Sequence, residues 1–227
     1  MNILYVGLAR SIWLFDFSLL NPKGLSLQGV IDGLKQRYQF AKAPKNALDL
    51  DERKALAFRS GTFVNSKRVP VLTAFTIYND GFAAETLAST DDSTEFLVEV
   101  EGWIKNEFGL IVPQPVKKAY VGQIDFESEV PLLGVNPQLA GFIKSIEDRY
   151  TPPDGKARHF DFAGISFWTE DANLPLAPAI LKVERKIGSP FSSNHYFSQT
   201  PLETQQHIEL LHELEQLLTP RNAESRS

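Results

Sequence analysis

The chain has 227 residues, a net charge of −5 at pH 7 and no cysteine. The absence of cysteine excludes disulfides, thiolate catalysis and cysteine-based zinc or iron–sulfur sites. Hydrophobic residues make up 43% of the sequence, which is typical of a globular protein and not of a disordered chain. No apolar run approaches the roughly 20 residues of a membrane-spanning helix, and the start does not resemble a signal peptide, so we expect a cytoplasmic protein without a membrane partner.

The first half of the sequence predicts a strand, a helix, three strands and a second helix. Alternating apolar residues indicate the strands, and apolar residues three and four positions apart indicate the helices. Asn79-Asp80-Gly81 predicts a tight turn, and Ser89 or Thr90 and Gly109 predict the two ends of the second helix. In chain order the elements are a strand over 3–17, a helix over 26–40, strands over 55–64, 69–78 and 82–88, and a helix over 91–108.

The second half of the sequence predicts the same order of elements. Asn136-Pro137 supplies an N-cap and a first-turn proline for the first helix. Thr200-Pro201-Leu202-Glu203 is a capping box that predicts the start of the last helix. The elements are a strand over 118–127, a helix up to Tyr150, strands over 159–168, 179–187 and 194–198, and a helix ending at Leu218.

A short sequence phrase is repeated on the first helix of each half. Ile31-x-x-Leu34-x-x-Arg37-Tyr38 returns as Ile143-x-x-Ile146-x-x-Arg149-Tyr150, at a constant offset of 112 residues (143 − 31). The alternative is a chance match. The helical spacing predicts that the apolar members of both copies face a core. We therefore expect pseudo-repeats over 1–112 and 113–219 in one continuous globular unit, followed by a polar tail over 220–227.

The predicted fold class is α+β. Two tandem β-α-β-β-β-α pseudo-repeats are expected to form a largely antiparallel sheet with the helices on one face and with pseudo-twofold symmetry. This order of elements is similar to the duplicated saddle of the TATA-binding-protein type. The resemblance lies in element order and includes no shared motif, so it implies a saddle-like arrangement and no particular function.

Several predicted strands are apolar on both faces, which predicts an apolar cover on the face opposite the helices. We expect that cover to be a partner (another protein or a second copy of the chain), a bound ligand, or the other half of the chain folded over this face. No sequence motif indicates a catalytic residue or a cofactor. The leading hypothesis is therefore a non-catalytic binding or adaptor subunit that acts through this sheet face or through the C-terminal helix.

Residues 184–197 concentrate the side chains that bind ligands. Arg185, Lys186 and His195 are suited to a phosphate or carboxylate, and Asn194 and Tyr196 add hydrogen-bonding groups. This segment supports the alternative hypothesis of a protein or enzyme that acts on an anionic small molecule. An ordinary structural connection is also consistent with its turn-forming residues.

A second set combines three carboxylates with one histidine. Asp125 and Glu127 share one face of a predicted strand, and His159 and Asp161 share one face of another. If these strands were neighbours, the four side chains could bind a divalent metal or act as acid and base. The other interpretation is a solvent-facing polar strip, and we predict no metal site.

Two further features complete the candidate sites. Lysine and arginine outnumber carboxylates over 42–68, which is the one indication of a nucleic-acid-binding saddle. The net charge of −5 opposes that hypothesis, because binding to phosphates normally requires a basic face.

His207 and His212 are five positions apart on the final helix, so they do not form a metal-binding pair, and we expect both on the surface.

Overall fold

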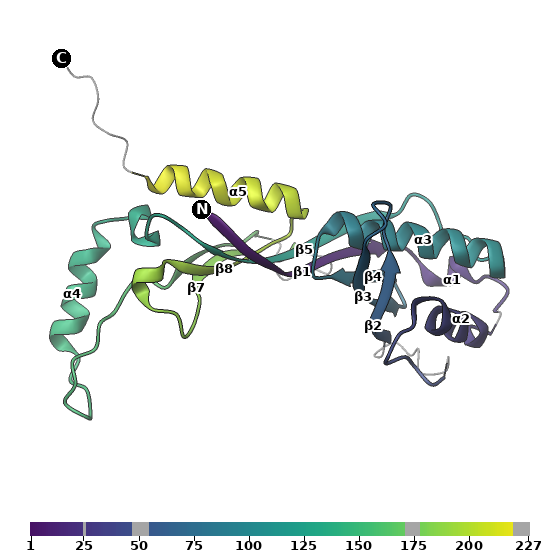
Figure 1. The fold of residues 1–227 in the computed structure, drawn as a ribbon, viewed down its shortest axis with the longest axis horizontal. Helices are drawn as coiled ribbons and strands as arrows, with labels where there is room; N and C mark the ends of the chain where they lie inside the picture. The colour runs from purple at the N-terminus through teal and green to yellow at the C-terminus, as the bar shows by residue number, and fades with distance from the viewer. Residues whose placement is uncertain (25, 47–54, 171–177, 220–227) are drawn as a thin grey trace, which may run out of the picture. The chain divides into compact units, whose positions relative to one another are not determined.

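The computed structural model describes residues 1–24, 26–46, 55–170 and 178–219 (Figure 1). Each half contains a strand, a helix, three strands and a final helix, as predicted, and the first half adds the short helix α1. Two short 3-10 helices, η2 and η3, lie in the second half. The elements are β1 (Asn2–Leu14), α1 (Phe17–Leu20), α2 (Gln28–Tyr38), β2 (Leu56–Val64), β3 (Pro70–Tyr78), β4 (Gly81–Thr86), α3 (Thr90–Phe108), β5 (Lys117–Glu127), η2 (Leu132–Val135), α4 (Leu139–Arg149), β6 (Gly164–Phe167), β7 (Leu181–Arg185), η3 (Phe191–Ser193), β8 (His195–Thr200) and α5 (Thr204–Leu218).

The described strands hydrogen-bond in the order β2-β3-β4-β1-β5-β8-β7-β6. From one edge the first half follows the order 2-3-4-1, and from the other edge the second half follows the corresponding order 6-7-8-5. The pairs β1–β4, β2–β3, β3–β4, β6–β7 and β7–β8 are antiparallel. The predicted α+β class, with an antiparallel sheet and a repeated order of elements, is confirmed.

The chain divides into two compact units. Unit 1 comprises Met1–Tyr5, Ile124–Gln199 and Gln206–Ser227, and unit 2 comprises Val6–Gln123 and Thr200–Gln205. The repeat boundary near residue 113 stays a prediction, because compactness alone does not test it. The predicted tail over 220–227 lies outside the described residues.

Unit 2 is built around an aromatic core. Helices α2 and α3 share this core with the sheet, so both lie on the same face of β1–β4. The rings of Phe75 and Phe96 are 5.7 Å apart and edge-on, which is a favourable arrangement for aromatic pairs. The repeated phrase contributes Ile31, Leu34 and Tyr38, which are 1%, 0% and 2% exposed. The prediction that this copy faces a core is confirmed.

The turn and cap residues of unit 2 act as predicted. The Ser89 hydroxyl accepts the backbone N–H of Asp92 at the start of α3, and Gly109 ends the helix at a φ of 66°. Gly81 has a φ of 146°, and a Cβ there would lie 1.9 Å from the carbonyl oxygen of Trp13. Only glycine fits such a close approach of two backbones. These local signals therefore fix the β3–β4 turn and the α3 helix.

Unit 1 has a smaller core, in which α5 covers one face of β7 and β8 (Figure 1). The prediction that His207 is a surface residue is wrong, because this side chain is 0% exposed. Its Nε2 atom lies 2.8 Å from the Ser198 hydroxyl, and burial lowers the pKa of the imidazole to about 4. His212 is exposed, as predicted. Leu211, four residues after His207 on the same side of the helix, is 2% exposed and belongs to the core.

Two predicted boundaries in the second half of the sequence are wrong. Helix α5 begins at Thr204, not at the predicted capping box, because the Thr200 hydroxyl instead accepts the N–H of Leu202 in a turn. The strand predicted over 159–168 is confined to Gly164–Phe167. A Cβ on Gly164 would lie 2.4 Å from the carbonyl oxygen of Val183, so glycine permits β6 to approach β7 closely.

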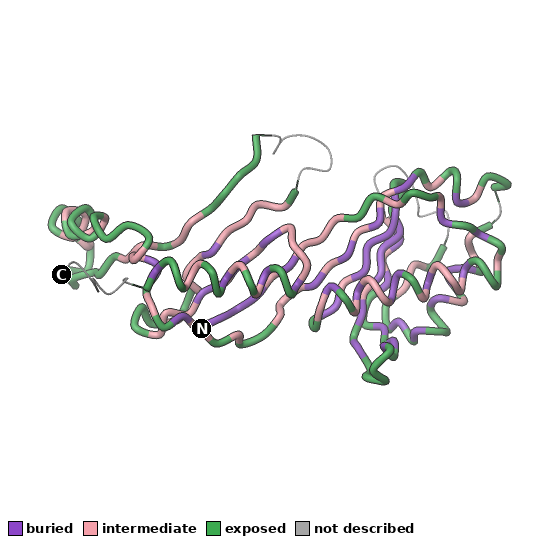
Figure 2. The backbone as a smooth tube through the Cα atoms, turned by 90° about the horizontal axis from the view of Figure 1, so that it is seen from above, coloured by how far each residue is buried: buried purple, intermediate pink, exposed green. Residues whose placement is uncertain are grey.

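Helix α4 carries the second copy of the repeated phrase without burying it. None of its residues is buried, and Figure 2 shows this helix only in the colours of intermediate and exposed residues. Phe142 is 63% exposed and Tyr150 is 44% exposed. The prediction that both copies of the phrase face a core is therefore wrong for the second copy.

Candidate ligand-binding site

Unit 1 contains an open pocket with a volume of about 560 Å³. Its walls come from the segment that leads into β6 and from the end of β7 with the loop that follows. It therefore brings residues from both predicted candidate sets to one place. The lining residues are His159, Phe160, Asp161, Ala163, Gly164, Ser166, Glu184, Arg185, Lys186, Ile187, Gly188, Ser189 and Phe191.

The pocket borders the sheet face opposite α5. Val183 lies opposite Ser198 in the β7–β8 register, and Ser198 bonds His207 of α5, so these two strand residues face the helix. Successive strand residues point to opposite faces. Glu184 and Phe197, the next pair in the register, therefore point away from α5. We call this surface the open face; its members on β7 and β8 are Lys182, Glu184, His195 and Phe197.

Lys186 is held at the pocket by a buried carboxylate. Its Nζ atom lies 2.5 Å from Oδ2 of Asp125, whose side chain is 3% exposed, and 3.3 Å from the Tyr5 hydroxyl. The Tyr5 hydroxyl also donates to Asp125 at 2.8 Å. The hydrogen bonds to Asp125 and Tyr5 raise the pKa of the Lys186 ammonium, so it is charged at neutral pH. The charge is further supported by the rings of Tyr5 and Phe197, whose centroids lie 5.8 and 5.9 Å away.

His195 lies between a serine of the pocket and the same carboxylate. Its Nδ1 atom is 3.0 Å from the Ser189 hydroxyl, and its Nε2 atom is 3.5 Å from Oδ2 of Asp125. The backbone N–H of Lys186 donates to the His195 carbonyl at 2.9 Å, which joins the loop to the start of β8. A hydroxyl, an imidazole and a carboxylate in this order can move a proton away from the hydroxyl.

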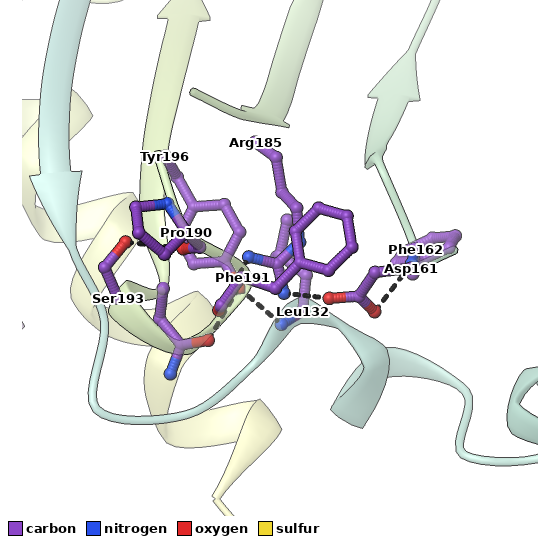
Figure 3. Close-up of polar contacts among 9 residues, drawn as sticks. Leu132, Asp161, Phe162, Arg185, Pro190, Phe191, Ser193 and Tyr196 are labelled. Atoms are coloured by element: carbon purple, nitrogen blue, oxygen red, sulfur yellow. Dashed lines mark hydrogen bonds and ion pairs between the residues drawn. The ribbon is translucent and has the colours of Figure 1, made fainter. Parts of the chain in front are cut away.

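Arg185 is bound within unit 1 and not displayed as a free cation (Figure 3). Its guanidinium forms an ion pair with Asp161 and donates to the carbonyl of Phe191 at 3.1 Å. The rings of Phe191 and Tyr196 lie 5.0 and 5.3 Å from the guanidinium carbon. Such stacking fixes the planar group. Arg185 therefore forms a wall of the pocket and organises the residues around it.

Tyr196 and Asn194 also have structural contacts. The Tyr196 ring is 0% exposed, and its hydroxyl accepts the backbone N–H of Leu132 at 3.0 Å. Burial raises the pKa of this phenol, so it is neutral at physiological pH. Asn194 adopts a φ of 45° at the end of η3, and its carbonyl accepts the N–H of Ser128 at 3.1 Å. Of the five predicted ligand-binding residues, Lys186 is the one whose charged group is both at the pocket and partly exposed.

Three of the four predicted acidic and histidine residues contact different partners. Asp125 contacts Lys186 and Asp161 contacts Arg185, whereas His159 lies 3.5 Å from Glu147 of α4. Glu127 lies on β5, two residues after Asp125. Among the residues that the structure describes, no group of three or more histidine, aspartate or glutamate side chains could hold a metal ion.

Two residues of the site were missed by the sequence interpretation. Tyr5 comes from the first strand, and no local pattern connects it with a segment more than 100 residues away. Ser189 was treated as a turn residue, and only its distance from His195 indicates another role.

The basic stretch predicted over 42–68 is described in part, because residues 47–54 lie outside the described residues. In the described part of the stretch, Arg59 forms an ion pair with Glu85 at 3.3 Å.

Comparisons with known proteins leave the function open. No protein-family model matches the sequence, and no curated protein matches it. Among solved structures, the chain is similar to "Methanococcus jannaschii TBP" with 13% sequence identity and a TM-score of 0.45, over 96% of this chain and 97% of that chain. Similarity at this level assigns neither a function nor a ligand. No helix in the described parts of the chain is long and apolar enough to cross a membrane.

Proposed function

We propose that this chain is a non-catalytic binding protein whose ligand occupies the pocket beside Lys186, on the open face of unit 1. The proposed ligand is a molecule that combines one acidic group with an apolar body. This proposal joins the predicted use of the sheet face with the predicted ligand-binding segment over 184–197.

The observation that carries the proposal is the positioning of the Lys186 ammonium. Its side chain is 36% exposed, while Asp125 and Tyr5 hold the charged group in place. An ammonium has three N–H donors, and the contacts with Asp125 and Tyr5 use two of them. The third donor is suited to an acidic group in the pocket. Because the lysine is already ordered, binding would require little additional loss of side-chain entropy.

The remaining pocket residues support the rest of the ligand class. Phe160, Ile187 and Phe191 are 37%, 99% and 46% exposed at the pocket. Exposed apolar side chains around a pocket favour a ligand with an apolar part. The carboxylates of Asp161 and Glu184 are paired with Arg185 and Lys182, which limits their repulsion of an anion.

Phenyl phosphate provides a direct test by titration into the isotope-labelled protein, followed by NMR. We expect the amide signals of Ile187, Gly188 and Ser189 to shift, with a dissociation constant on the order of a millimolar for so small a molecule. Inorganic phosphate lacks the apolar body and benzyl alcohol lacks the acidic group, so both should bind more weakly. A single-stranded oligonucleotide in the same titration tests the nucleic-acid alternative.

Substitution of the lysine tests the assigned contact. Lys186→Gln should weaken phenyl phosphate binding roughly tenfold, as expected when one charge-assisted hydrogen bond is lost. Lys105→Gln, which changes an exposed lysine of α3, is the matched control and should bind like the unaltered protein. Equal binding by the two variants, or an absence of shifts over 186–191 well above millimolar phenyl phosphate, would reject the proposal.

An acyl hydrolase is a second candidate, favoured by the 3.0 Å contact between the Ser189 hydroxyl and His195 Nδ1. Asp125 lies 3.5 Å from His195 Nε2, which has no hydrogen-bond partner in the described structure. In this reaction Ser189 Oγ attacks an ester carbonyl, His195 Nδ1 takes the hydroxyl proton and gives it to the leaving alcohol, and water then releases the acid. Asp125 also accepts hydrogen bonds from Lys186 and Tyr5, which reduces the negative charge that supports the imidazole.

A fluorophosphonate probe distinguishes this candidate from simple binding. A reactive Ser189 would displace fluoride and add the phosphonyl group to its oxygen, which intact-protein mass spectrometry and peptide mapping detect. Ser189→Ala should abolish the modification, whereas Ser193→Ala, in the same loop, should retain it. An unmodified protein would eliminate the hydrolase and leave the binding proposal in place.

A further inference from the structure

The described sheet ends at two edge strands, β2 in unit 2 and β6 in unit 1. An edge strand presents unpaired backbone N–H and C=O groups, which form a template for another strand, and proteins normally block such edges. An edge that is left open therefore indicates a place where a further strand can bind.

The β2 edge is blocked by the chain itself. Backbone hydrogen bonds join Arg59 and Lys42 in both directions, at 2.8 and 3.2 Å, so a preceding segment lies along the outer side of β2. The register of β2 with β3 also shifts between Phe58 and Gly61. Such a bulge interrupts the regular spacing that a further strand would need.

The β6 edge has neither of these protections. Among the described strands, β7 alone pairs with β6, and the register of this pair is continuous from Gly164 to Phe167. Residues 162–168 contain no charged side chain and no proline, the residue types that commonly discourage pairing at an edge. Phe167 and Trp168 are 60% and 69% exposed beside this edge. Unit 1 therefore ends in an open and uncharged strand.

The register with β7 determines which backbone groups of β6 face outward. The N–H of Arg185 in β7 donates to the Ala163 carbonyl at 2.7 Å, so Ala163 and every second residue after it bond to β7. The residues between them, Gly164 and Ser166, direct their N–H and C=O groups away from β7. Trp168, directly after β6, follows the same alternation. Another extended backbone is the structure that matches donors and acceptors at this spacing.

We propose that β6 pairs antiparallel with β6 of a second copy of this chain, about a twofold axis at Ser166. This register uses all three outward positions, because Gly164 then lies opposite Trp168 of the second copy and Ser166 lies opposite its own counterpart. On the other face of the strands, Ile165 lies opposite Phe167 of the second copy. The two β6 strands would join the sheets of the two copies.

The side chains of β6 fit a second copy of the same strand. Each exposed aromatic residue meets a smaller or β-branched one, since Trp168 lies opposite Gly164 and Phe167 lies opposite Ile165. Aromatic residues opposite glycine or β-branched residues are favourable cross-strand pairs. Ser166 is uncharged, so no like charges meet at the axis. The pairing therefore covers the large side chains that a single copy leaves exposed at this edge.

A proline at the axis tests the backbone hydrogen bonds. Sedimentation equilibrium of the unaltered protein should show a reversible dimer with a dissociation constant on the order of 10–100 µM, because one strand pair is a small interface. Ser166→Pro removes an outward N–H that β7 does not use, so the monomer should fold, with an unchanged circular dichroism spectrum. The dissociation constant should rise at least about tenfold. Ser166→Thr keeps the N–H and is the matched control.

Opposite charges at Ser166 test the twofold axis without proline. Ser166→Lys and Ser166→Asp each place two like charges opposite one another in the dimer, so each variant alone should be mainly monomeric. The exposed position of Ser166 allows either side chain in the monomer. An equimolar mixture should form a heterodimer, which native mass spectrometry distinguishes by mass, because lysine then lies opposite aspartate.

Three results would overturn the proposal. The first is an unaltered protein that stays monomeric at about 1 mM, about ten times above the expected range; the open edge would then belong to a strand of another protein. The second is a dimer that Ser166→Pro leaves unchanged. The third is a mixture of the lysine and aspartate variants that associates no more than either variant alone.

Discussion

The two units differ in how completely they bury their large apolar side chains. In unit 2, the sheet, α2 and α3 enclose an aromatic core that contains Phe58, Phe75 and Phe96 at 0–1% exposure. In unit 1, the described core is smaller and includes the buried polar pair Ser198 and His207. Unit 1 instead displays large apolar side chains at the pocket and on α4. The same order of elements therefore gives one unit with a large enclosed core and one that leaves large apolar side chains exposed.

The contrast between the two units is clearest in α2 and α4, the helices that carry the two copies of the repeated phrase. Leu34 is 0% exposed on α2, whereas no residue of α4 is buried. The helical stripe is equally regular in both, so amphipathicity alone does not determine burial. The difference lies in the surroundings, because α3 supplies Trp103 and Phe108 against α2. The lesson is that a hydrophobic stripe predicts that a surface will be covered, but not which molecule covers it.

The largest expected effect comes from truncating the same position in the two copies. Leu34→Ala should lower the free energy of unfolding by roughly 2–5 kcal/mol, because it leaves a cavity in a close-packed core. Ile146→Ala should change it by less than about 1 kcal/mol in the monomer, because this side chain is only partly buried and leaves no enclosed cavity. Urea denaturation of both variants at low protein concentration measures the difference. Similar losses in the two variants would contradict the contrast between the helices.

The buried histidine of unit 1 should make stability depend on pH. Burial lowers the pKa of His207 to about 4 from an ordinary value of 6.5, so the unfolded chain binds the proton more tightly than the folded one. The contribution of neutral His207 is complete above pH 6.5 and is lost as the pH falls toward 4. The loss should reach about 3 kcal/mol, at about 1.4 kcal/mol per pKa unit.

A matched comparison isolates this group from the carboxylates that also titrate in acid. The unfolding free energy is measured at pH 7 and at pH 4.5 for the unaltered protein, His207→Leu and His212→Ala. His207→Leu should show a smaller decrease between the two pH values, while His212→Ala, which changes an exposed residue, should follow the unaltered protein. An equal decrease in all three proteins would show that His207 does not carry the dependence.

Local sequence signals predicted most of the fold, because strands, turns and helix ends depend mainly on residues that are close in the sequence. A predicted strand overlaps each of the eight described strands, and Gly81 and Gly109 marked a turn and a helix end through their backbone conformations. Errors arose where a distant contact decides the outcome. His207 was predicted to be exposed but is buried in a hydrogen bond with Ser198. Strand β6 begins at Gly164, where the chain approaches β7 closely. Neither contact has a signature in its own segment.

The candidate site was predictable in part for the same reason. The segment over 184–197 was identified from its residue types, and Lys186 and His195 do lie together near Asp125. The composition could not separate Lys186, whose charge is at the pocket, from Arg185, which is stacked between two rings. That distinction depends on neighbours from η3 and β8. Tyr5 was not predictable, because it joins the site through the pairing of distant strands.

The smallest expected effect concerns the arginine that both copies of the phrase share. Arg37 donates to Glu99 at 2.9 Å, and the two side chains are 43% and 34% exposed, so solvent screens most of their attraction. Arg37→Ala should cost no more than about 0.5–1 kcal/mol, and a double-mutant cycle with Glu99→Ala should give a coupling of about 0.5 kcal/mol. The coupling should fall in about 1 M salt, where charges are screened within roughly 3 Å.

Arg149→Ala is the control for this last measurement. Arg149 is exposed at the end of α4, so its removal should leave the unfolding free energy of the monomer unchanged. If Arg149→Ala destabilised the monomer as much as Arg37→Ala, the shared arginine would act within its own helix, for example on the C-terminal carbonyl groups. If only Arg37→Ala lowered the free energy of unfolding, the effect would come from the contact between Arg37 and Glu99. That contact exists only in the first copy of the phrase, where α3 packs against the helix.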